Sequence, residues 1–281
     1  MFRLYPVVKL MRPEQWVKNT FIFGPLLFSG LLTDMLSVQH TLSAFVIFCL
    51  ASSATYVLND CKDIENDRKH PVKSKKRPLA SGEVNKRQAC ILMMALYGLV
   101  ALSTLFYPKV VAVAVAYLVI NVAYTFYLKH QPVLDIFTIA TGFVLRVYAG
   151  AVSLEVPFSS WMFITVLSLA LFLATIKRGQ ELVKSGNKAR RVLQYYTSEV
   201  ADKYATMSAT CAILFYSLYV MSEKPDMVYT IPFVLFGLYR YWFIVESKGA
   251  GESPTDALLA DRWLQLTILA WMGFCIYLLY I

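Results

Sequence analysis

Stretches of about twenty consecutive apolar residues recur along almost the whole chain, and no other feature limits its fold so strongly. A helix of about 20 apolar residues crosses the ~30 Å hydrocarbon core of a bilayer. Only 16% of the residues are charged and the mean hydropathy is +0.53, whereas soluble domains carry about 25% charged residues. The stretches are continuous rather than alternating, which excludes barrel strands. We therefore expect an all-α, polytopic helical bundle in the lipid bilayer, forming one domain over residues 1–281.

Hydropathy predicts nine transmembrane helices. Their expected ranges are 17–33, 41–58, 88–107, 109–127, 134–153, 159–176, 204–222, 228–246 and 263–281. The third and fourth ranges are separated at Tyr107-Pro108-Lys109, since proline interrupts a helix.

The distribution of positive charge predicts the orientation of these helices. Most of the 27 lysines and arginines precede the first helix or follow the even-numbered ones, and such residues mark the cytoplasmic side. The N-terminus is then cytoplasmic, the C-terminus external, and we expect the inner (plasma) membrane as the location. This asymmetry also accounts for the net charge of +9, so we expect no nucleic-acid partner.

An acidic segment, Asn59-Asp60-Cys61-Lys62-Asp63-Ile64-Glu65-Asn66-Asp67, follows the second expected helix. If that helix continues, a turn of about 100° per residue places Asp60, Asp63 and Asp67 on one face, while Glu65 points away. Three neighbouring carboxylates repel one another unless a cation neutralises them, and oxygen ligands suit Mg²⁺. We predict that the three aspartates bind Mg²⁺ and act in catalysis; the alternative is a solvated, salt-bridged helix end.

A basic segment comes next in the chain, Lys73-Ser74-Lys75-Lys76-Arg77-Pro78. Lysine and arginine beside a metal site suit a polyphosphate, because they neutralise the oxygens that the metal leaves. Lys75 and Arg77 are the candidates, although part of this charge is the cytoplasmic topology signal.

Two charged residues occupy the fifth expected helix, Asp135 near its start and Arg146 eleven residues later. Eleven residues make about three turns, so both side chains face the same way and Arg146 lies ~16 Å deeper. Charge at that depth is costly and usually faces a cavity or a partner. A site role and a structural ion pair are the two readings.

Three further positions keep structural alternatives. Lys177 and Glu181 have the i,i+4 spacing of a helical ion pair. Asp256 follows Ser253-Pro254, a helix-start signal that suits capping. Asp261 and Arg262 lie where the last helix enters the membrane and suit anchoring as well as binding.

Taken together, these segments resemble the UbiA superfamily of intramembrane prenyltransferases over nearly the whole chain. The resemblance rests on Asn59–Asp67, on Arg77-Pro78-Leu79-Ala80-Ser81-Gly82, and on Tyr124…Leu128-Lys129…Asp135 leading to Arg146. Members with aromatic acceptors carry a second aspartate-rich motif after the sixth helix. Here that loop is basic, with Lys177, Arg178, Lys184, Lys188, Arg190 and Arg191.

The basic loop, Ser253–Arg262 and the opening Met11-Arg12-Pro13…Gln15-Trp16-Val17-Lys18-Asn19 resemble the decaprenyl-phosphate phosphoribosyltransferase branch. The resemblance implies a magnesium-dependent transfer of 5-phosphoribosyl from phosphoribosyl diphosphate to decaprenyl or undecaprenyl phosphate. The substrate-binding residues it implies are Asn59, Lys75, Arg77, Tyr124, Lys129, Asp135, Arg146, Lys177, Arg178, Glu181, Asp256, Asp261 and Arg262.

Two other functions stay open at this point. One is prenyl transfer to an aromatic acceptor, against which the missing second motif counts. The other is transport of an anionic solute, although no inverted repeat or pair of broken helices is evident. The sequence leaves open the polyprenyl length, the oligomeric state, and Mg²⁺ over Mn²⁺.

Overall fold

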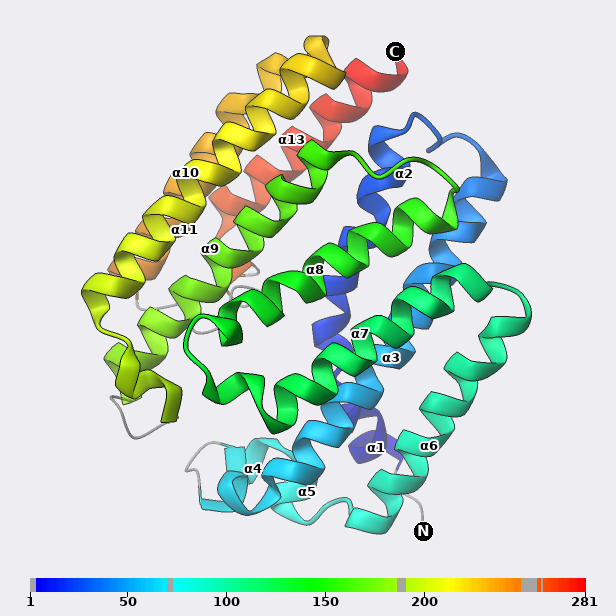
Figure 1. Ribbon diagram of the computed structural model, residues 1–281, viewed down its shortest axis with the longest axis vertical. Helices are drawn as coiled ribbons and strands as arrows, with labels where there is room; N and C mark the ends of the chain where they lie inside the picture. Colours follow the sequence, from blue (N-terminus) through cyan, green and yellow to red (C-terminus); the bar gives the residue numbers. More distant parts are fainter. Residues whose placement is uncertain (1–3, 70–72, 186–190, 249–256, 259) are drawn as a thin grey trace. The chain divides into compact units, whose positions relative to one another are not determined.

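The computed structural model describes residues 4–69, 73–185, 191–248, 257–258 and 260–281, and every regular element in these ranges is a helix (Figure 1). The all-α prediction is confirmed for this part of the chain. The helices group into two compact units, Met1–Phe126 with Leu145–Val156, and Tyr127–Val144 with Pro157–Ile281. Helix α8 (Leu134–Ser153) contributes to both. We describe each unit by itself.

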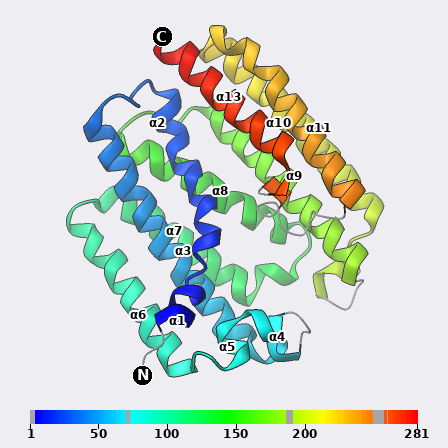
Figure 2. The same ribbon diagram turned by 180° about the vertical axis from the view of Figure 1, so that it is seen from behind.

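The first unit is built on one long helix, α3, against which η1, α6 and α7 pack. Figure 2 shows η1 running beside α3. Besides the end of α8, its elements are α1 (Leu4–Leu10), the 3₁₀ helix η1 (Pro13–Phe23), α2 (Gly24–Phe28), α3 (Met35–Lys69), α4 (Lys73–Lys76), α5 (Pro78–Ser81), α6 (Lys86–Leu102), η2 (Ser103–Leu105) and α7 (Pro108–Phe126).

Local sequence accounts for where these helices begin and end. No glycine or proline occurs within α3, so nothing interrupts its 35 residues. Helix α6 begins with a capping box, in which Asn85 and Gln88 satisfy each other's backbone amides. Helix α7 begins at Pro108, the first-turn position that proline favours. The predicted interruption between the third and fourth helices is therefore confirmed.

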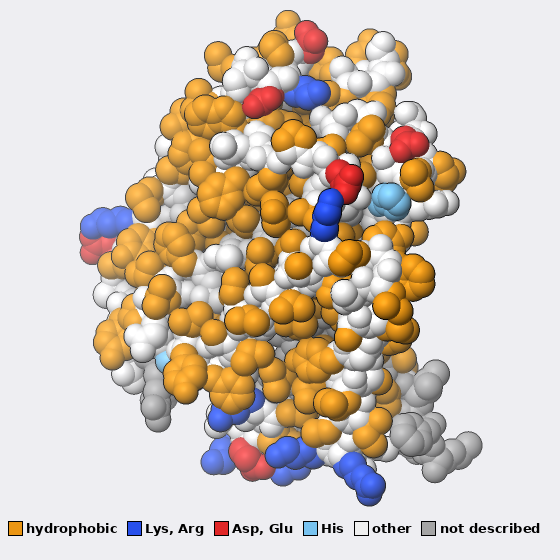
Figure 3. All heavy atoms as spheres, turned by 45° about the vertical axis from the view of Figure 1, so that its right-hand side comes forward, with side chains coloured by type: hydrophobic (Ala, Val, Ile, Leu, Met, Phe, Trp, Pro, Cys, Tyr) orange, Lys and Arg blue, Asp and Glu red, His pale blue; other side chains and the backbone are white. Residues whose placement is uncertain are grey.

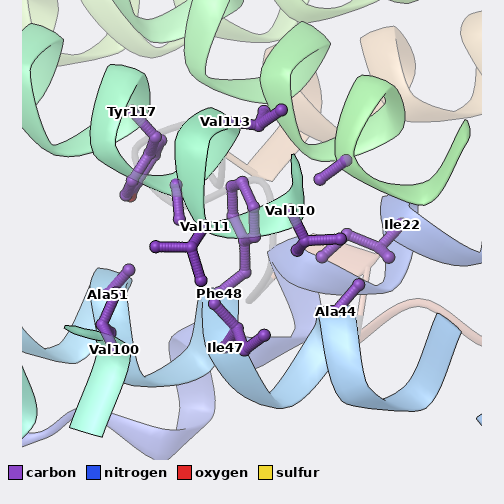
Figure 4. Packing of buried hydrophobic residues seen from close by; sticks show 12 residues of the cluster. Ile22, Ala44, Ile47, Phe48, Ala51, Val100, Val110, Val111, Val113 and Tyr117 are labelled. Carbon is purple, nitrogen blue, oxygen red and sulfur yellow. The ribbon is translucent and has the colours of Figure 1, made fainter. Parts of the chain in front are cut away.

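The core of the first unit lies between α3, α6 and α7 (Figure 4). Phe48 is fully buried, and its ring lies 5.5 Å from that of Tyr117, centroid to centroid. Ala44 and Ala51, on the same helix, are small enough for the neighbouring helices to approach closely.

A glycine on α8 allows a close helix contact in the first unit. A Cβ atom on Gly150 would lie 2.0 Å from the carbonyl oxygen of Ile22 and 3.2 Å from the ring of Pro25. We expect Gly150→Ala to lower the free energy of unfolding by about 1–3 kcal/mol, because backbone must shift to admit the methyl group. Thermal unfolding in detergent measures this.

The control is Gly98→Ala on α6, where nothing lies within 4 Å and alanine should be neutral or stabilising by about 0.5–1 kcal/mol. Equal melting temperatures for the two variants would contradict the close contact.

The second unit is a set of long helices in which α9 packs against α10, and α11 against α13 (Figure 1). Phe172 is fully buried at its centre, with its ring 5.8 Å from that of Tyr241 and 5.3 Å from that of Trp242. Besides the start of α8, its elements are η3 (Leu128–His130), α9 (Ser160–Ser185), η5 (Arg191–Tyr195), α10 (Ser198–Glu223), η6 (Pro225–Thr230), α11 (Ile231–Lys248) and α13 (Arg262–Tyr280).

Eight helices among the described residues are long and apolar enough to cross a membrane, and the surface seen in Figure 3 is mainly hydrophobic. The chain is therefore an integral membrane protein. These eight correspond to the second through ninth predicted spans. The first prediction, one helix over 17–33, is not confirmed: the segment forms η1 and the short α2, followed by a turn with Gly30 at φ 77°.

Candidate functional site

The acidic segment lies on the last turns of α3, as predicted. Asp60 and Asp67 are 2% and 4% exposed, and Asp63 is half-buried. Glu65 points to solvent with a side chain 73% exposed and pairs there with Arg68. The burial pattern agrees with the predicted placement of the three aspartates on one face, with Glu65 turned away.

Two arginines bind the buried carboxylates of this face. Arg77 bonds to Asp67 Oδ2 and lies 3.0 Å from Asp60 Oδ1. Arg12 donates to the same Asp60 oxygen at 2.5 Å. Pro78 holds Arg77 in the extended conformation that residues before proline adopt, φ −96° and ψ 123°. The structure thus brings together Asp60, Asp67 and the arginine that the sequence singled out.

Arg12 is a site residue that the sequence analysis missed. It appeared there only in the opening motif, because no local pattern pairs it with an aspartate 48 residues away. Its backbone is left-handed, with φ 54° and ψ 62°, a conformation that costs of order 1–3 kcal/mol and clusters at functional sites. Its guanidinium carbon lies 5.1 Å from the ring centroid of Tyr56, and Ser53 Oγ donates to the carbonyl of Met11 at 2.9 Å. These contacts hold the turn against α3.

The carboxylates of α3 offer one oxygen to a cation. Asp60 Oδ2 is buried and has no hydrogen-bond partner within the described ranges. A buried carboxylate oxygen is costly unless it is paired. No group of three histidine, cysteine or acidic side chains in the part of the chain described is arranged to hold a metal ion. Mg²⁺ usually takes only one or two protein carboxylates, together with water and substrate phosphates. Asp60 and the half-buried Asp63 therefore fit Mg²⁺, while Asp67 is engaged by Arg77.

Arg146 lies in a separate buried network of the first unit and is 4% exposed. Its Nε donates to Asn19 Oδ1 at 2.7 Å, and a terminal nitrogen donates to the Tyr117 hydroxyl at 3.1 Å. Its guanidinium carbon lies 4.8 Å from the centroid of the Tyr117 ring. Asn19 in turn donates to Ser52 on α3 at 3.2 Å. Arg146 thus joins η1, α7 and α3, and Asn19 and Tyr117 were absent from the predicted site.

In the second unit, Asp135 and Arg178 form a buried ion pair, 0% and 1% exposed, with Arg178 Nε donating at 2.6 Å. Arg178 also donates to Glu181 at 2.5 Å. The sequence had suggested Lys177 as a partner for Glu181; the structure adds Arg178 at i,i+3. Asp135 and Arg146 both lie on α8, and each is bonded within its own unit, Asp135 to Arg178 and Arg146 to Asn19.

Tyr196 completes this cluster and was also missed by the sequence analysis. Its hydroxyl donates to Asp135 Oδ1 at 2.8 Å and accepts from the backbone amide of Val133 at 2.9 Å. Burial raises the pKa of Tyr196, and the neighbouring Asp135 carboxylate raises it further. The hydroxyl is therefore protonated at neutral pH and acts as a donor to Asp135.

Asp261 has a structural role in the second unit. It accepts two bonds from Arg240, at 3.0 and 2.8 Å, and caps α13 by accepting from the Leu264 amide at 2.9 Å. This geometry supports the anchoring alternative. Arg262 beside it is exposed, and Asp256 lies outside the described residues.

The other predicted substrate-binding residues are accessible to different degrees. Lys75 is exposed; the half-buried ones are Asn59, Tyr124, Lys129 and Lys177. The structure therefore divides the predicted site into three groups. They are the acid–arginine network on α3, in which Arg12 and Arg77 bind Asp60 and Asp67, the Arg146 network, and the Asp135–Arg178 cluster.

Comparison with known proteins places this arrangement in a family. Residues 21–258 match the model of the UbiA prenyltransferase family. The chain belongs to this family. UbiA relatives include a decaprenyl-phosphate phosphoribosyltransferase of Mycobacterium tuberculosis, 38% identical over 95% of this chain and 92% of that protein. Another, from Mycolicibacterium smegmatis, is 36% identical over 95% of this chain and 90% of that protein.

A solved structure supports the UbiA fold. A UbiA homologue from Archaeoglobus fulgidus bound to GPP and Mg²⁺ has a TM-score of 0.74 with this chain. The two are 19% identical, and the match covers 98% of this chain and 100% of that one. At this identity the likeness establishes the fold.

Proposed function

We propose that this UbiA protein transfers the 5-phosphoribosyl group of phosphoribosyl diphosphate to a polyprenyl phosphate lipid and releases diphosphate. The observation that carries the proposal is the similarity, over 95% of the chain, to decaprenyl-phosphate phosphoribosyltransferases at 36% and 38% identity. The acid–arginine network on α3 supplies groups suited to a metal-bound diphosphate. The acceptor is decaprenyl or undecaprenyl phosphate.

The basic segment that follows the predicted sixth span, and whose first part lies on α9, supports this choice over an aromatic acceptor. Its sequence is basic where aromatic-acceptor members carry a second aspartate-rich motif, and Glu181 is its nearest acid. In the structure Glu181 accepts from Arg178. Basic residues suit substrates with more phosphate groups: phosphoribosyl diphosphate carries a 5-phosphate besides its diphosphate, and the lipid acceptor carries a phosphate of its own.

Asp60 and Asp63 would hold Mg²⁺, with Asp67 joining them when Arg77 moves from it. Bound Mg²⁺ would supply Lewis-acid stabilisation of the departing diphosphate. Arg77 lies 3.0 Å from Asp60, and Lys75 precedes Arg77 by two residues in the chain. Both would bind the remaining diphosphate oxygens.

The reaction requires little proton transfer by the protein. As diphosphate departs, positive charge develops at the anomeric carbon, and an oxygen of the lipid phosphate attacks it. A phosphate monoester is anionic at pH 7, so no general base is needed, and catalysis rests on positioning and electrostatics. This agrees with a candidate site made of carboxylates and arginines. Asn59, Tyr124, Lys129, Asp135, Arg146, Lys177, Arg178, Asp256 and Arg262 stay candidate substrate-binding residues.

The proposed topology has nine spans with a cytoplasmic N-terminus in the plasma membrane. A 3₁₀ helix rises about 2.0 Å per residue and an α-helix 1.5 Å, so η1 and α2 together measure about 30 Å. That length matches the hydrocarbon core. The basic residues of 59–87 and 177–203 would then face the cytoplasm.

We also propose that the two units work as one transmembrane domain over residues 1–281. The family match over residues 21–258 includes parts of both units. Their shared helix α8 supports the same conclusion.

The proposal is tested with the full chain in nanodiscs, labelled phosphoribosyl diphosphate, decaprenyl phosphate and Mg²⁺. We expect a labelled, butanol-extractable lipid that forms only with decaprenyl phosphate present. Chelation of Mg²⁺ should stop its formation, and added Mg²⁺ should restore it, because the α3 carboxylates need a cation to hold the diphosphate.

Matched reactions replace the donor by a prenyl diphosphate and the acceptor by an aromatic acid. Prenylated aromatic product without any labelled lipid would overturn the proposal and favour the aromatic-acceptor function.

A further inference from the structure

The oxygens of α3 that suit a metal ion are largely bound by arginine. Asp60 Oδ1 lies 3.0 Å from Arg77 and 2.5 Å from Arg12, and Asp67 Oδ2 is bonded to Arg77. One guanidinium therefore bridges two carboxylates that are at least nine-tenths buried. A divalent cation that coordinates Asp60 Oδ1 or Asp67 Oδ2 must take that oxygen from arginine, and one that coordinates Asp60 Oδ2 enters beside the Arg77 guanidinium.

Charge balance decides when that exchange is favourable. With Asp63, three carboxylates and two guanidiniums carry a net charge of −1, so a dication that enters alone leaves the network positive. The displaced Arg77 would also lose two charge-assisted bonds and lie close to the metal. A diphosphate that enters with the metal lowers both the cost of the excess positive charge and the cost of the bonds that Arg77 loses. Its charge compensates the dication, and its oxygens accept paired bonds from the released guanidinium.

Arg77 is the arginine placed to make this exchange. The two arginine side chains are about equally exposed, but the backbone of Arg77 joins two four-residue helices, α4 and α5. Arg12 contacts Asp60 but also lies over the Tyr56 ring, within a turn tied to α3 by Ser53. Arg12 therefore stays on Asp60 while Arg77 moves.

We propose that Arg77 is a positioning residue that keeps divalent cations off Asp60 and Asp67 until a diphosphate arrives with them. Arg77 exchanges its two carboxylates for diphosphate oxygens, so that metal binding and diphosphate binding become coupled. This inference rests on the proposed function, because it takes the diphosphate of that substrate as the anion. Free metal and free diphosphate each bind weakly, and the pair binds well.

The test measures Mn²⁺ bound to the full chain in nanodiscs by equilibrium dialysis and electron paramagnetic resonance, with and without inorganic pyrophosphate. For the wild type we expect pyrophosphate to lower the Kd for Mn²⁺ by about tenfold or more, a typical coupling between two ligands. Arg77→Gln should bind Mn²⁺ alone about tenfold tighter than the wild type, and pyrophosphate should then add little.

The matched control is Arg68→Gln. Arg68 lies beside Asp67 at the end of α3, but its side chain is 51% exposed and pairs with Glu65. It should behave as the wild type does. Since Arg77→Gln removes the arginine from the buried Asp67 and lowers stability, melting temperatures give a second measurement. Mn²⁺ alone should raise the melting temperature of Arg77→Gln more than that of the wild type.

Equal Mn²⁺ affinity of the wild type with and without pyrophosphate would overturn the inference. So would an Arg77→Gln protein whose affinity for Mn²⁺ alone matches that of Arg68→Gln. The assay contains neither phosphoribosyl diphosphate nor lipid. Coupling without lipid product in the transfer assay therefore rejects the proposed function alone, and product without coupling rejects this inference alone.

Discussion

Asp60→Asn should lower the rate of phosphoribosyl transfer by about 10²–10³-fold, the usual cost of losing one preorganised electrostatic group. Asp60 is the carboxylate at which the network converges: one oxygen receives Arg12 and Arg77, and the other is buried with no partner in the described part of the chain. Asparagine keeps the shape but removes the negative charge. Both the metal and the arginines would then be held less well.

The measurement is labelled lipid formed per minute at saturating substrates and Mg²⁺, with the melting temperature recorded for each protein. The control is Glu65→Gln, the carboxylate of the same segment whose side chain is 73% exposed. It should retain wild-type activity. If Asp60→Asn were as active as Glu65→Gln, the acidic face of α3 would not be the metal site.

Arg178→Met should lower the free energy of unfolding by about 3–5 kcal/mol, the cost of removing one partner from a buried ion pair. Arg178 and Asp135 are 1% and 0% exposed, so loss of the guanidinium leaves a carboxylate in the interior, where the Tyr196 hydroxyl is its remaining side-chain donor among the described residues. Thermal or denaturant unfolding in detergent measures the change.

Two comparisons separate the ion pair from general effects of substitution. Lys203→Met removes an exposed pair with Glu199, 71% and 76% exposed, and should cost at most about 1 kcal/mol. The double variant Asp135→Asn with Arg178→Met should recover part of the lost stability, because no buried charge is then left alone. A single variant as stable as Lys203→Met would contradict a structural role for the pair.

The features predicted correctly from the sequence depend on local periodicity. The acidic face of α3 follows from helix geometry once the helix continues, and nothing between Met35 and Lys69 stops it. Arg77 was singled out because of the proline after it, and the structure shows the extended conformation that this proline imposes. Both inferences need only neighbours within a few turns.

The missed contacts of Arg12 and Tyr196 join residues far apart in the chain. Arg12 reaches Asp60 across 48 positions, and Tyr196 reaches Asp135 across 61. Arg12 also depends on a left-handed backbone that residues other than glycine rarely adopt, and no sequence pattern signals it here. Tertiary packing brings these partners together, and local patterns in a single sequence do not predict such long-range contacts.

The segment over 17–33 shows a limit of hydropathy as a predictor. Its apolar composition is that of a membrane helix, but the chain adopts a 3₁₀ helix, in which fewer residues cover the same distance. Asn19 is fully buried there and is bound to Arg146 and Ser52. A hydropathy average records the polarity of this asparagine but not its buried partners.

The uninterrupted length of α3 has a consequence for how a lipid substrate is selected. At 1.5 Å per residue its 35 residues measure about 52 Å, some 20 Å more than the hydrocarbon core. Because α3 is one uninterrupted helix, its length fixes how far Asp60 lies from the apolar part of the helix along the helix axis. A lipid phosphate rests at the headgroup level whatever the number of isoprene units below it. The height of Asp60 therefore does not distinguish polyprenyl phosphates of different tail length.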